Sequence, residues 1–246
     1  EHDGDEIAMV LIGGVNYYSG QAFDMKTITK KAHEYNCLVG FDLAHATGNL
    51  KLELHDWGVD FAAWCGYKYL NGGPGAPSGV FIHERHLGKT DIPRFEGWWG
   101  HDKSTRFEMP DEFIPIETAE AWQLSNPPIM AMAPLLASLE IFHEAGMDNL
   151  VKKNIQLTNY LEKLILSQLS SQIEIITPTN PNDRGCQLSL RFIYSIDNIM
   201  DQLNDAGIIA DWRGPDVIRI APVPLYNTFV DCFEFVRRLK SLISEQ

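Results

Sequence analysis

Residues 37–45 read CLVGFDLAH, an apolar run that ends at Asp42 and is soon followed by His45. An earlier apolar run, IAMVLI at Ile7–Ile12, precedes a segment with a helical hydrophobic period that begins at Asp24. Strand, helix and strand in this order predict a βαβ unit, whose parallel strands are covered on both faces and present ligand sites at their carboxyl ends. Asp42 stands at such an end. On these residues alone three interpretations are open: Asp42 and His45 as a catalytic pair, as metal ligands, or as a helix N-cap with a surface histidine. Asp caps helices readily, which favours the cap, and metal binding is disfavoured because further ligands are missing at useful spacing.

The rest of the chain continues to alternate short strands and helices. Strands are expected at Phe61–Cys65 and Gly79–Ile82, an irregular segment over 84–116, and helices at Ile129–Ala145 and Asp148–Leu169. In the tail, strands are expected at Ile173–Ile176, Cys186–Phe192, Ile208–Asp211 and Val217–Ile220, and helices at Ile196–Ala206 and from Thr228. The pattern predicts an α/β domain over residues 1–135 and a smaller α+β domain over residues 136–246.

The composition excludes several classes of protein. Against 33 Asp and Glu the chain has 20 Lys and Arg, a net charge of −13, which disfavours nucleic acid and anionic membranes as partners. The sequence contains no apolar run long enough to span a bilayer, and its first residues, EHDGDE, give no reason to expect secretion. The four cysteines are far apart, which disfavours disulfide and zinc frameworks and indicates buried thiols in a reducing, cytoplasmic setting.

Lys68 changes the interpretation of Asp42. It follows the apolar run Phe61–Cys65, stands between Tyr67 and Tyr69, and is followed by a glycine-rich turn. An isolated lysine at such a place is usually solvated. An amine and a carboxylate at the ends of two successive strands, however, suit pyridoxal phosphate, because the amine bonds the cofactor aldehyde and the acid keeps the pyridine nitrogen protonated.

Several further motifs occur in the same order as in one known family. They are GGVNYYSGQ at 13–21, GFDLAHATGN at 40–49, WCGYKYLN at 64–71, GWWGH at 97–101, SNPP at 125–128 and RIAPVPLYN at 219–227. From about Ile7 to the C-terminus the chain resembles kynureninase, a fold-type I pyridoxal-phosphate hydrolase of the class V aminotransferase group. The Asp-x-x-His and lysine elements are common to that wider group, whereas the 97–101, 125–128 and 219–227 motifs are more particular to kynureninase.

The resemblance implies a fold and roles for the residues around the cofactor. The fold would be a three-layer α/β/α large domain, lacking its N-terminal part here, with a small α+β C-terminal domain. Lys68 resembles the lysine that bonds the cofactor, Asp42 the partner of the pyridine nitrogen, and His45 a neighbour of the cofactor ring. Tyr67 resembles a tyrosine that hydrogen-bonds the cofactor phosphate, and it is also a candidate base.

The resemblance also assigns three residues nearer the substrate. Trp98 resembles a tryptophan that reaches the cofactor phosphate, and Asn126 an asparagine beside the cofactor and the aromatic ring of the substrate, both across a homodimer interface. Arg219 matches the arginine that binds the α-carboxylate of the substrate. Taken singly, Trp98 would be a core aromatic residue, Asn126 a cap before Pro127, and Arg219 a charge at a strand edge.

The implied activity is hydrolysis of L-kynurenine or 3-hydroxy-L-kynurenine to L-alanine and anthranilate or 3-hydroxyanthranilate, in tryptophan catabolism and NAD biosynthesis. Relatives carry a long segment before the equivalent of Ile7 that contributes to the phosphate site, so the chain resembles the C-terminal part of the enzyme. Two alternatives remain: another class V enzyme, such as a cysteine desulfurase or an aminotransferase, or an inactive fragment. A desulfurase needs an exposed, mobile cysteine, which the predicted positions of the four cysteines do not provide.

Overall fold

The computed structural model describes residues 3–194, 196 and 198–244, and the chain forms two compact units. Unit 1 comprises residues 1–13, 24–44 and 52–140, and unit 2 comprises residues 14–23, 45–51 and 141–246. Each unit has its own sheet. The predicted domain division at 135/136 stays a prediction, because compactness groups two early segments with the later part of the chain.

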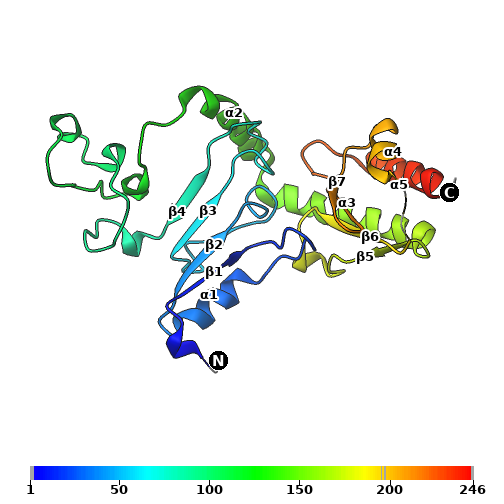
Figure 1. Cartoon of the computed structure of the whole chain (residues 1–246), viewed down its shortest axis with the longest axis horizontal. Coiled ribbons are helices and arrows are strands. Elements are labelled where there is room, and N and C mark those ends of the chain that lie inside the picture. Colours follow the sequence, from blue (N-terminus) through cyan, green and yellow to red (C-terminus); the bar gives the residue numbers. More distant parts are fainter. Residues whose placement is uncertain (1–2, 195, 197, 245–246) are drawn as a thin grey trace. The chain divides into compact units, whose positions relative to one another are not determined.

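Unit 1 contains the predicted βαβ unit. Its sheet has the order β1 (Met9–Gly13), β2 (Leu38–Asp42), β3 (Phe61–Trp64) and β4 (Gly79–Ile82), as Figure 1 shows. β1, β2 and β3 are parallel, and β4 is antiparallel to β3. Helix α1 (Met25–His33) connects β1 to β2, and the side chain of Asp24 caps it by accepting a hydrogen bond from the Thr27 amide at 3.0 Å.

The two faces of this sheet differ in what covers them. The side chains of Val39, Phe41 and Ala62 are fully buried on the face against which α1 packs. The opposite face carries four apolar side chains that are 44–59% exposed: Met9, Leu11, Leu38 and Val80. The expectation that the first strand is covered on both faces therefore fails within the described part of this chain, where one face of β1 is open.

The remainder of unit 1 is mostly irregular, as expected for residues 84–116. It holds short 3-10 helices, η1 (Gly4–Glu6), η2 (Glu84–His86), η3 (Trp98–Gly100), η4 (Arg106–Glu108) and η5 (Ala119–Trp122). Helix α2 (Ile129–Ala145) has the predicted bounds, and its first twelve residues belong to unit 1. Among the described residues, no helix combines the length and apolar character that crossing a membrane requires.

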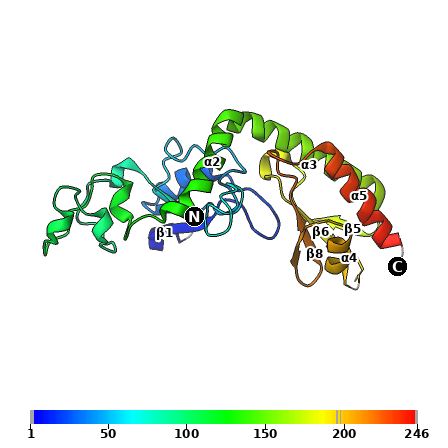
Figure 2. The same cartoon turned by 90° about the horizontal axis from the view of Figure 1, so that it is seen from above.

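Unit 2 is an antiparallel sheet with helices on one face. The strand order is β5 (Ile173–Ile175), β6 (Leu188–Phe192), β8 (Val217–Ile220) and β7 (Asp211–Arg213). Helices α3 (Met147–Leu169) and α5 (Phe229–Ser244) lie side by side, as Figure 2 shows, and α4 (Ile199–Asp205) joins them in one apolar core. The core side of the sheet supplies alternate residues such as Leu188, Leu190 and Ile218, which leaves polar residues on the other side.

Several predicted elements of unit 2 have different bounds in the structure, and two of them differ by three residues at one end. The strand expected at Ile208–Asp211 is β7 at Asp211–Arg213, because the Ile208 amide closes the end of α4 on the Leu203 carbonyl at 2.8 Å. The helix expected at Ile196–Ala206 is α4 from Ile199, and Asp197 within that range lies outside the described residues.

Candidate functional site

Asp42 lies where β2 and β3 end side by side. In the parallel register Asp42 pairs with Ala63, and the Leu43 amide donates to the Ala63 carbonyl at 2.8 Å. The side chain is exposed and accepts a hydrogen bond from the Ala44 amide at 2.8 Å. The carboxylate therefore lies at the carboxyl end of the parallel strands, where such sheets present ligand sites, and its oxygens have lone pairs left for another donor.

The loop that carries Lys68 leaves the sheet at the same carboxyl end, directly after β3. Gly66 and Gly72 shape it: a side chain on Gly66 would collide with the Pro77 carbonyl, and the Gly72 amide donates to the Gly66 carbonyl at 2.9 Å. From α2, the buried Ser138 hydroxyl donates to the Leu70 carbonyl at 2.7 Å. The glycines and this anchor give Lys68 a fixed backbone position, which a residue that bonds a cofactor needs.

Tyr67 and Lys68 form a pair on this loop. The Lys68 ammonium lies 5.8 Å from the centre of the Tyr67 ring, within the range of a cation–π contact, and the tyrosine is 54% exposed. Asp42, Tyr67 and Lys68 thus all lie at, or just beyond, the carboxyl ends of strands β2 and β3. An amine, a carboxylate and a phenol in this arrangement are the groups that hold and tune a pyridine aldehyde.

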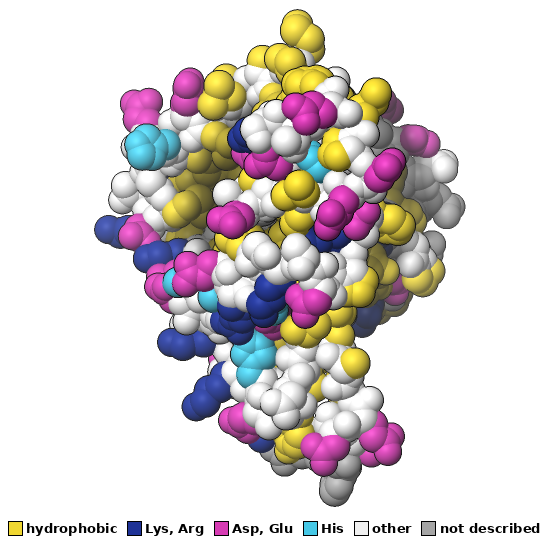
Figure 3. Space-filling view, turned by 90° about the vertical axis from the view of Figure 1, so that its left-hand side faces the viewer, with side chains coloured by type: hydrophobic (Ala, Val, Ile, Leu, Met, Phe, Trp, Pro, Cys, Tyr) yellow, Lys and Arg dark blue, Asp and Glu magenta, His cyan; other side chains and the backbone are white. Residues whose placement is uncertain are grey.

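Trp98 and Asn126 lie in the irregular lobe formed by residues 84–128. Gly97 packs so closely on the backbone of Leu124 that a side chain there would overlap it, and this contact joins the two segments. Trp98 is exposed, with its ring 5.7 Å from that of Phe107, and Asn126 is exposed beside Ser125. Figure 3 faces this end of unit 1 and shows hydrophobic side chains exposed among charged ones.

His45 and Arg219 belong to unit 2. The carbonyl of His45 accepts a hydrogen bond from the Asn49 side chain at 2.9 Å, and the imidazole is half-buried. Arg219 on β8 is 11% exposed, and its guanidinium donates to the Tyr17 carbonyl and to the Asp211 carboxylate, each at 2.7 Å. The arginine is thus ordered on the polar side of its sheet, although its partner Asp211 was not among the residues singled out from the sequence.

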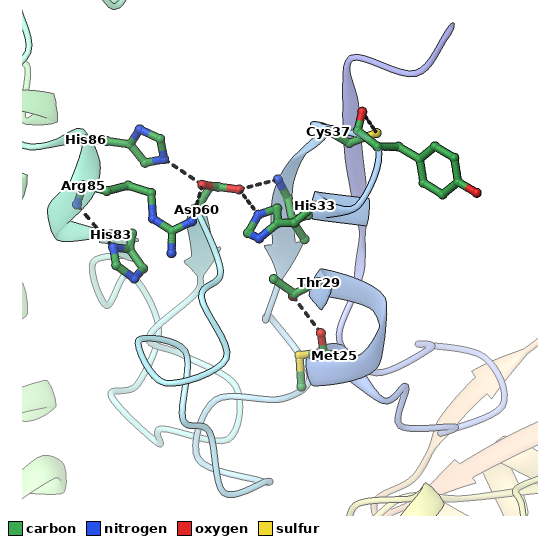
Figure 4. Close-up of polar contacts among 10 residues, drawn as sticks. Met25, Thr29, His33, Cys37, Asp60, His83, Arg85 and His86 are labelled. Carbon is green, nitrogen blue, oxygen red and sulfur yellow. Dashed lines mark hydrogen bonds and ion pairs between the residues drawn. The ribbon is translucent and has the colours of Figure 1, made fainter. Parts of the chain in front are cut away.

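A second carboxylate, Asp60, stands at the opposite end of the unit 1 sheet, just before β3. It is 3% exposed and accepts hydrogen bonds from the Val39 amide at 2.8 Å and from the Nε2 atoms of His33 and His86 at 2.8 and 2.7 Å, as Figure 4 shows. Arg85 adds a contact at 3.4 Å. Burial alone raises the pKa of Asp60, but the hydrogen bonds from His33, His86 and Val39 outweigh it and hold the pKa below its usual value.

The sequence analysis did not find the Asp60 cluster. The residues come from α1, the start of β3 and the η2 segment, so their separation in sequence carries no short-range signal. Four donors around one carboxylate make a structural tie between elements rather than a reactive group. Within the described residues, no three His, Cys, Asp or Glu side chains are placed to hold a metal ion.

Comparison with known proteins agrees with the motifs. A family model described as the kynureninase C-terminal domain matches residues 150–239. The kynureninase of Koribacter versatilis is 56% identical over 238 residues, covering 97% of this chain and 56% of the relative. That of Flavobacterium psychrophilum is 54% identical over 246 residues, covering 98% of this chain and 58% of the relative. The chain thus spans a little over half the length of these relatives.

Solved structures share the fold at low sequence identity. A cysteine desulfurase from Thermococcus onnurineus superposes with a TM-score of 0.81 at 18% identity, over 100% of this chain and 63% of that one. An alanine–glyoxylate aminotransferase from Nostoc superposes with a TM-score of 0.73 at 16% identity, over 96% of this chain and 62% of that one. At this identity the likeness shows the fold alone, and it confirms the predicted fold class.

Proposed function

Since this chain is homologous to the carboxyl-terminal part of kynureninases, we propose that the protein is a pyridoxal-phosphate-dependent hydrolase of this type. It would cleave the Cβ–Cγ bond of L-kynurenine or 3-hydroxy-L-kynurenine to give L-alanine and anthranilate or 3-hydroxyanthranilate. With this activity the protein would act in tryptophan catabolism and NAD biosynthesis, in the cytoplasm. The single observation that supports it best is the position of Asp42 and of the Tyr67–Lys68 pair at and beyond the carboxyl ends of two adjacent parallel strands, in a chain more than half identical to kynureninases.

The residues present fit the cofactor. Asp42 is an exposed carboxylate at a strand end with acceptor capacity to spare, and Lys68 is an amine on a loop with a fixed backbone. These two residues would hold the pyridine nitrogen and the aldehyde, with His45, Tyr67, Trp98 and Asn126 completing the cofactor contacts. When bound, pyridoxal phosphate supplies an electron sink for bonds at the substrate α-carbon and β-carbon.

Each side chain has a distinct task in this proposal. Lys68 would take the proton from the substrate α-carbon, a role that suits an amine in a partly desolvated place. Asp42, as a carboxylate, would favour a proton on the pyridine nitrogen of the cofactor. Tyr67 binds the cofactor phosphate and orients or deprotonates the water that attacks the γ-carbonyl.

Arg219 and Asn126 would bind opposite ends of the substrate. Arg219 binds the α-carboxylate, for which a planar guanidinium offers paired donors. Asn126 contacts the aromatic end. In a homodimer, Trp98 and Asn126 would reach the site of the partner subunit, and the exposed apolar side chains Phe95 and Phe107 beside Trp98 are consistent with a covered lobe.

Cysteine desulfuration is the main alternative activity, and the cysteines argue against it. That reaction needs a thiolate that reaches the substrate. Cys37, Cys186 and Cys232 are buried, and burial raises the pKa of Cys232 to about 11, which keeps it a thiol at neutral pH. Cys65 is half-buried, directly after β3.

A direct test uses the complete gene product with pyridoxal phosphate and L-kynurenine, following anthranilate by its fluorescence and L-alanine by amino-acid analysis. We expect equal amounts of the two products, and the visible absorbance of bound cofactor in the wild type. Alanine formation from cysteine without kynurenine cleavage would instead assign the protein to the desulfurases. Absence of both cofactor absorbance and turnover would identify an inactive remnant.

A further inference from the structure

The polar face of the unit 2 sheet holds Arg219 in a row of facing residues. The antiparallel register places Arg219 on β8 opposite Asp211 on β7 and opposite Ser189 on β6. Residues directly opposite each other on one face of a sheet are close enough to interact. Asp211 is therefore placed by backbone pairing, and not by a flexible loop, to contact the guanidinium.

The contacts use one hydrogen on each terminal nitrogen of Arg219. Nη1 donates to the Tyr17 carbonyl and Nη2 to an oxygen of Asp211, both at 2.7 Å. Each terminal nitrogen carries two hydrogens, so one donor remains on each. Nη1 and Nη2 thus each retain one donor for a ligand carboxylate.

Both partners of Arg219 are themselves held in place. The Tyr17 carbonyl also accepts a hydrogen bond from Gln187 Nε2 at 3.1 Å, and neighbouring Tyr18 and Ser19 are tied to the same face by Ser189 and Thr177. Asp211 also contacts Arg213 at 3.2 Å, so a second cation shares its charge and Arg219 is not fully neutralised. The guanidinium thus sits in a rigid frame that still carries positive charge.

We propose that Asp211 is a positioning residue that holds the Arg219 guanidinium ready for the α-carboxylate of an amino-acid substrate. Ordering the long arginine side chain before binding lowers the conformational freedom that the ligand would otherwise have to remove. The inference rests on the proposed role of Arg219 and extends it, because neither the motifs nor the family resemblance assigned a role to Asp211.

The test compares four variants of the complete gene product: Asp211→Ala, Asp211→Asn, Arg219→Ala and Glu174→Ala. Glu174 is the matched control, because it faces Arg191 across the same sheet at 3.1 Å in the same kind of pair. The measurements are KM and kcat for L-kynurenine, the dissociation constant of L-alanine, and thermal unfolding. Because the Asp211 side chain is 48% exposed, we expect its variants to fold.

We expect Asp211→Ala to raise KM and the alanine dissociation constant about tenfold with kcat within about threefold, since binding is lost and chemistry is not. Asp211→Asn should recover most of the loss, because its amide oxygen still accepts from the guanidinium. Glu174→Ala should leave both constants unchanged. If Asp211→Ala does not fold, Asp211→Asn serves as the test: its KM should rise by less than tenfold, and its kcat should not fall.

Three outcomes would overturn the proposal. Tighter alanine binding in either Asp211 variant would show that Asp211 competes with the ligand. An equal effect of Glu174→Ala would show that losing any such ion pair of this sheet weakens binding. An unchanged KM and alanine dissociation constant in both Asp211 variants would show that Arg219 needs no positioning. If Arg219→Ala itself has no effect on alanine binding, the proposed role of Arg219 fails, which is distinguishable because the other failures leave the Arg219→Ala loss intact.

Discussion

At the amino end of the unit 1 sheet, the buried Asp60 accepts hydrogen bonds from a backbone amide, two histidines and an arginine. At the carboxyl end the exposed Asp42 accepts one from the Ala44 amide, within the part of the chain that the structure describes. Two aspartates at adjacent strands thus differ: the oxygens of Asp60 are surrounded by hydrogen-bond donors, whereas those of Asp42 can accept further hydrogen bonds. The difference teaches that the fold uses one carboxylate to tie its elements together and keeps the other available for a ligand.

The largest effect is expected from removing the amine at the carboxyl end. Lys68→Ala should lower turnover of L-kynurenine by about 10³-fold or more, because the group that moves the α-proton is lost. Unfolding by urea should be nearly unchanged, since the loop is held by Gly66, Gly72 and Ser138. Peptide mapping after borohydride reduction provides the check, and a cofactor adduct retained on the same peptide would contradict the assignment.

The reciprocal experiment targets the amino end. Asp60→Ala should lower the free energy of unfolding by about 3 kcal/mol, because it leaves the donors of His33, His86 and the Val39 amide without their acceptor. Turnover per folded molecule should stay the same. Asp56→Ala is the control, since it removes an exposed Asp–His pair and should change stability little. Equal losses in the two variants would end the distinction between a saturated and a surface carboxylate.

Asp42→Asn separates chemistry from stability at the other carboxylate. A neutral amide does not favour a protonated pyridine nitrogen, so turnover should fall by about 10²-fold or more. The free energy of unfolding should change by no more than about 0.5 kcal/mol, because the side chain is exposed. Kinetics and urea titration of the same preparation measure both. Near-normal turnover would make Asp42 a local cap on the Ala44 amide and nothing more.

The smallest effect concerns pH. The pKa of Asp60 is lowered in the folded state, so its contribution to stability is complete above the unfolded value of about 3.9 and is lost as the pH falls through the folded pKa. Asp60→Asn should therefore flatten the acid limb of the stability curve below about pH 4, relative to the wild type. Urea midpoints between pH 3 and 6 give the comparison, and parallel acid limbs for Asp60→Asn and wild type would refute it.

Most of the fold was predictable because hydrophobic periodicity reports which side of an element is buried. The strand at Gly79–Ile82, the helix at Ile129–Ala145 and the strand at Val217–Ile220 have the predicted bounds. The bounds that differ depend on contacts outside the element itself. β6 begins at Leu188 and not at Cys186, because the Cys186 amide donates to the Asn49 side chain, a contact between distant residues that no local pattern reports.

The sequence predicted those residues of the candidate site that lie at or just after the end of a strand. Asp42 and Lys68 were found because each follows an apolar run. Asp211 and Asp60 were not, because their roles depend on strand register and on residues brought together from separate elements. The assigned roles of His45, Trp98, Asn126 and Arg219 stay predictions, and Arg219→Ala with the alanine binding measurement tests the last of them.

The open face of the unit 1 sheet also affects how strongly copies of this chain associate with one another in solution. Met9 and Leu11 on β1, Leu38 on β2 and Val80 on β4 expose apolar surface on this face. Strand β1 also has β2 on one side and no described strand on the other. Apolar patches and open strand edges attract one another. Light scattering from this chain should therefore rise with concentration and with added sulfate, and a dye that brightens in apolar surroundings should bind it.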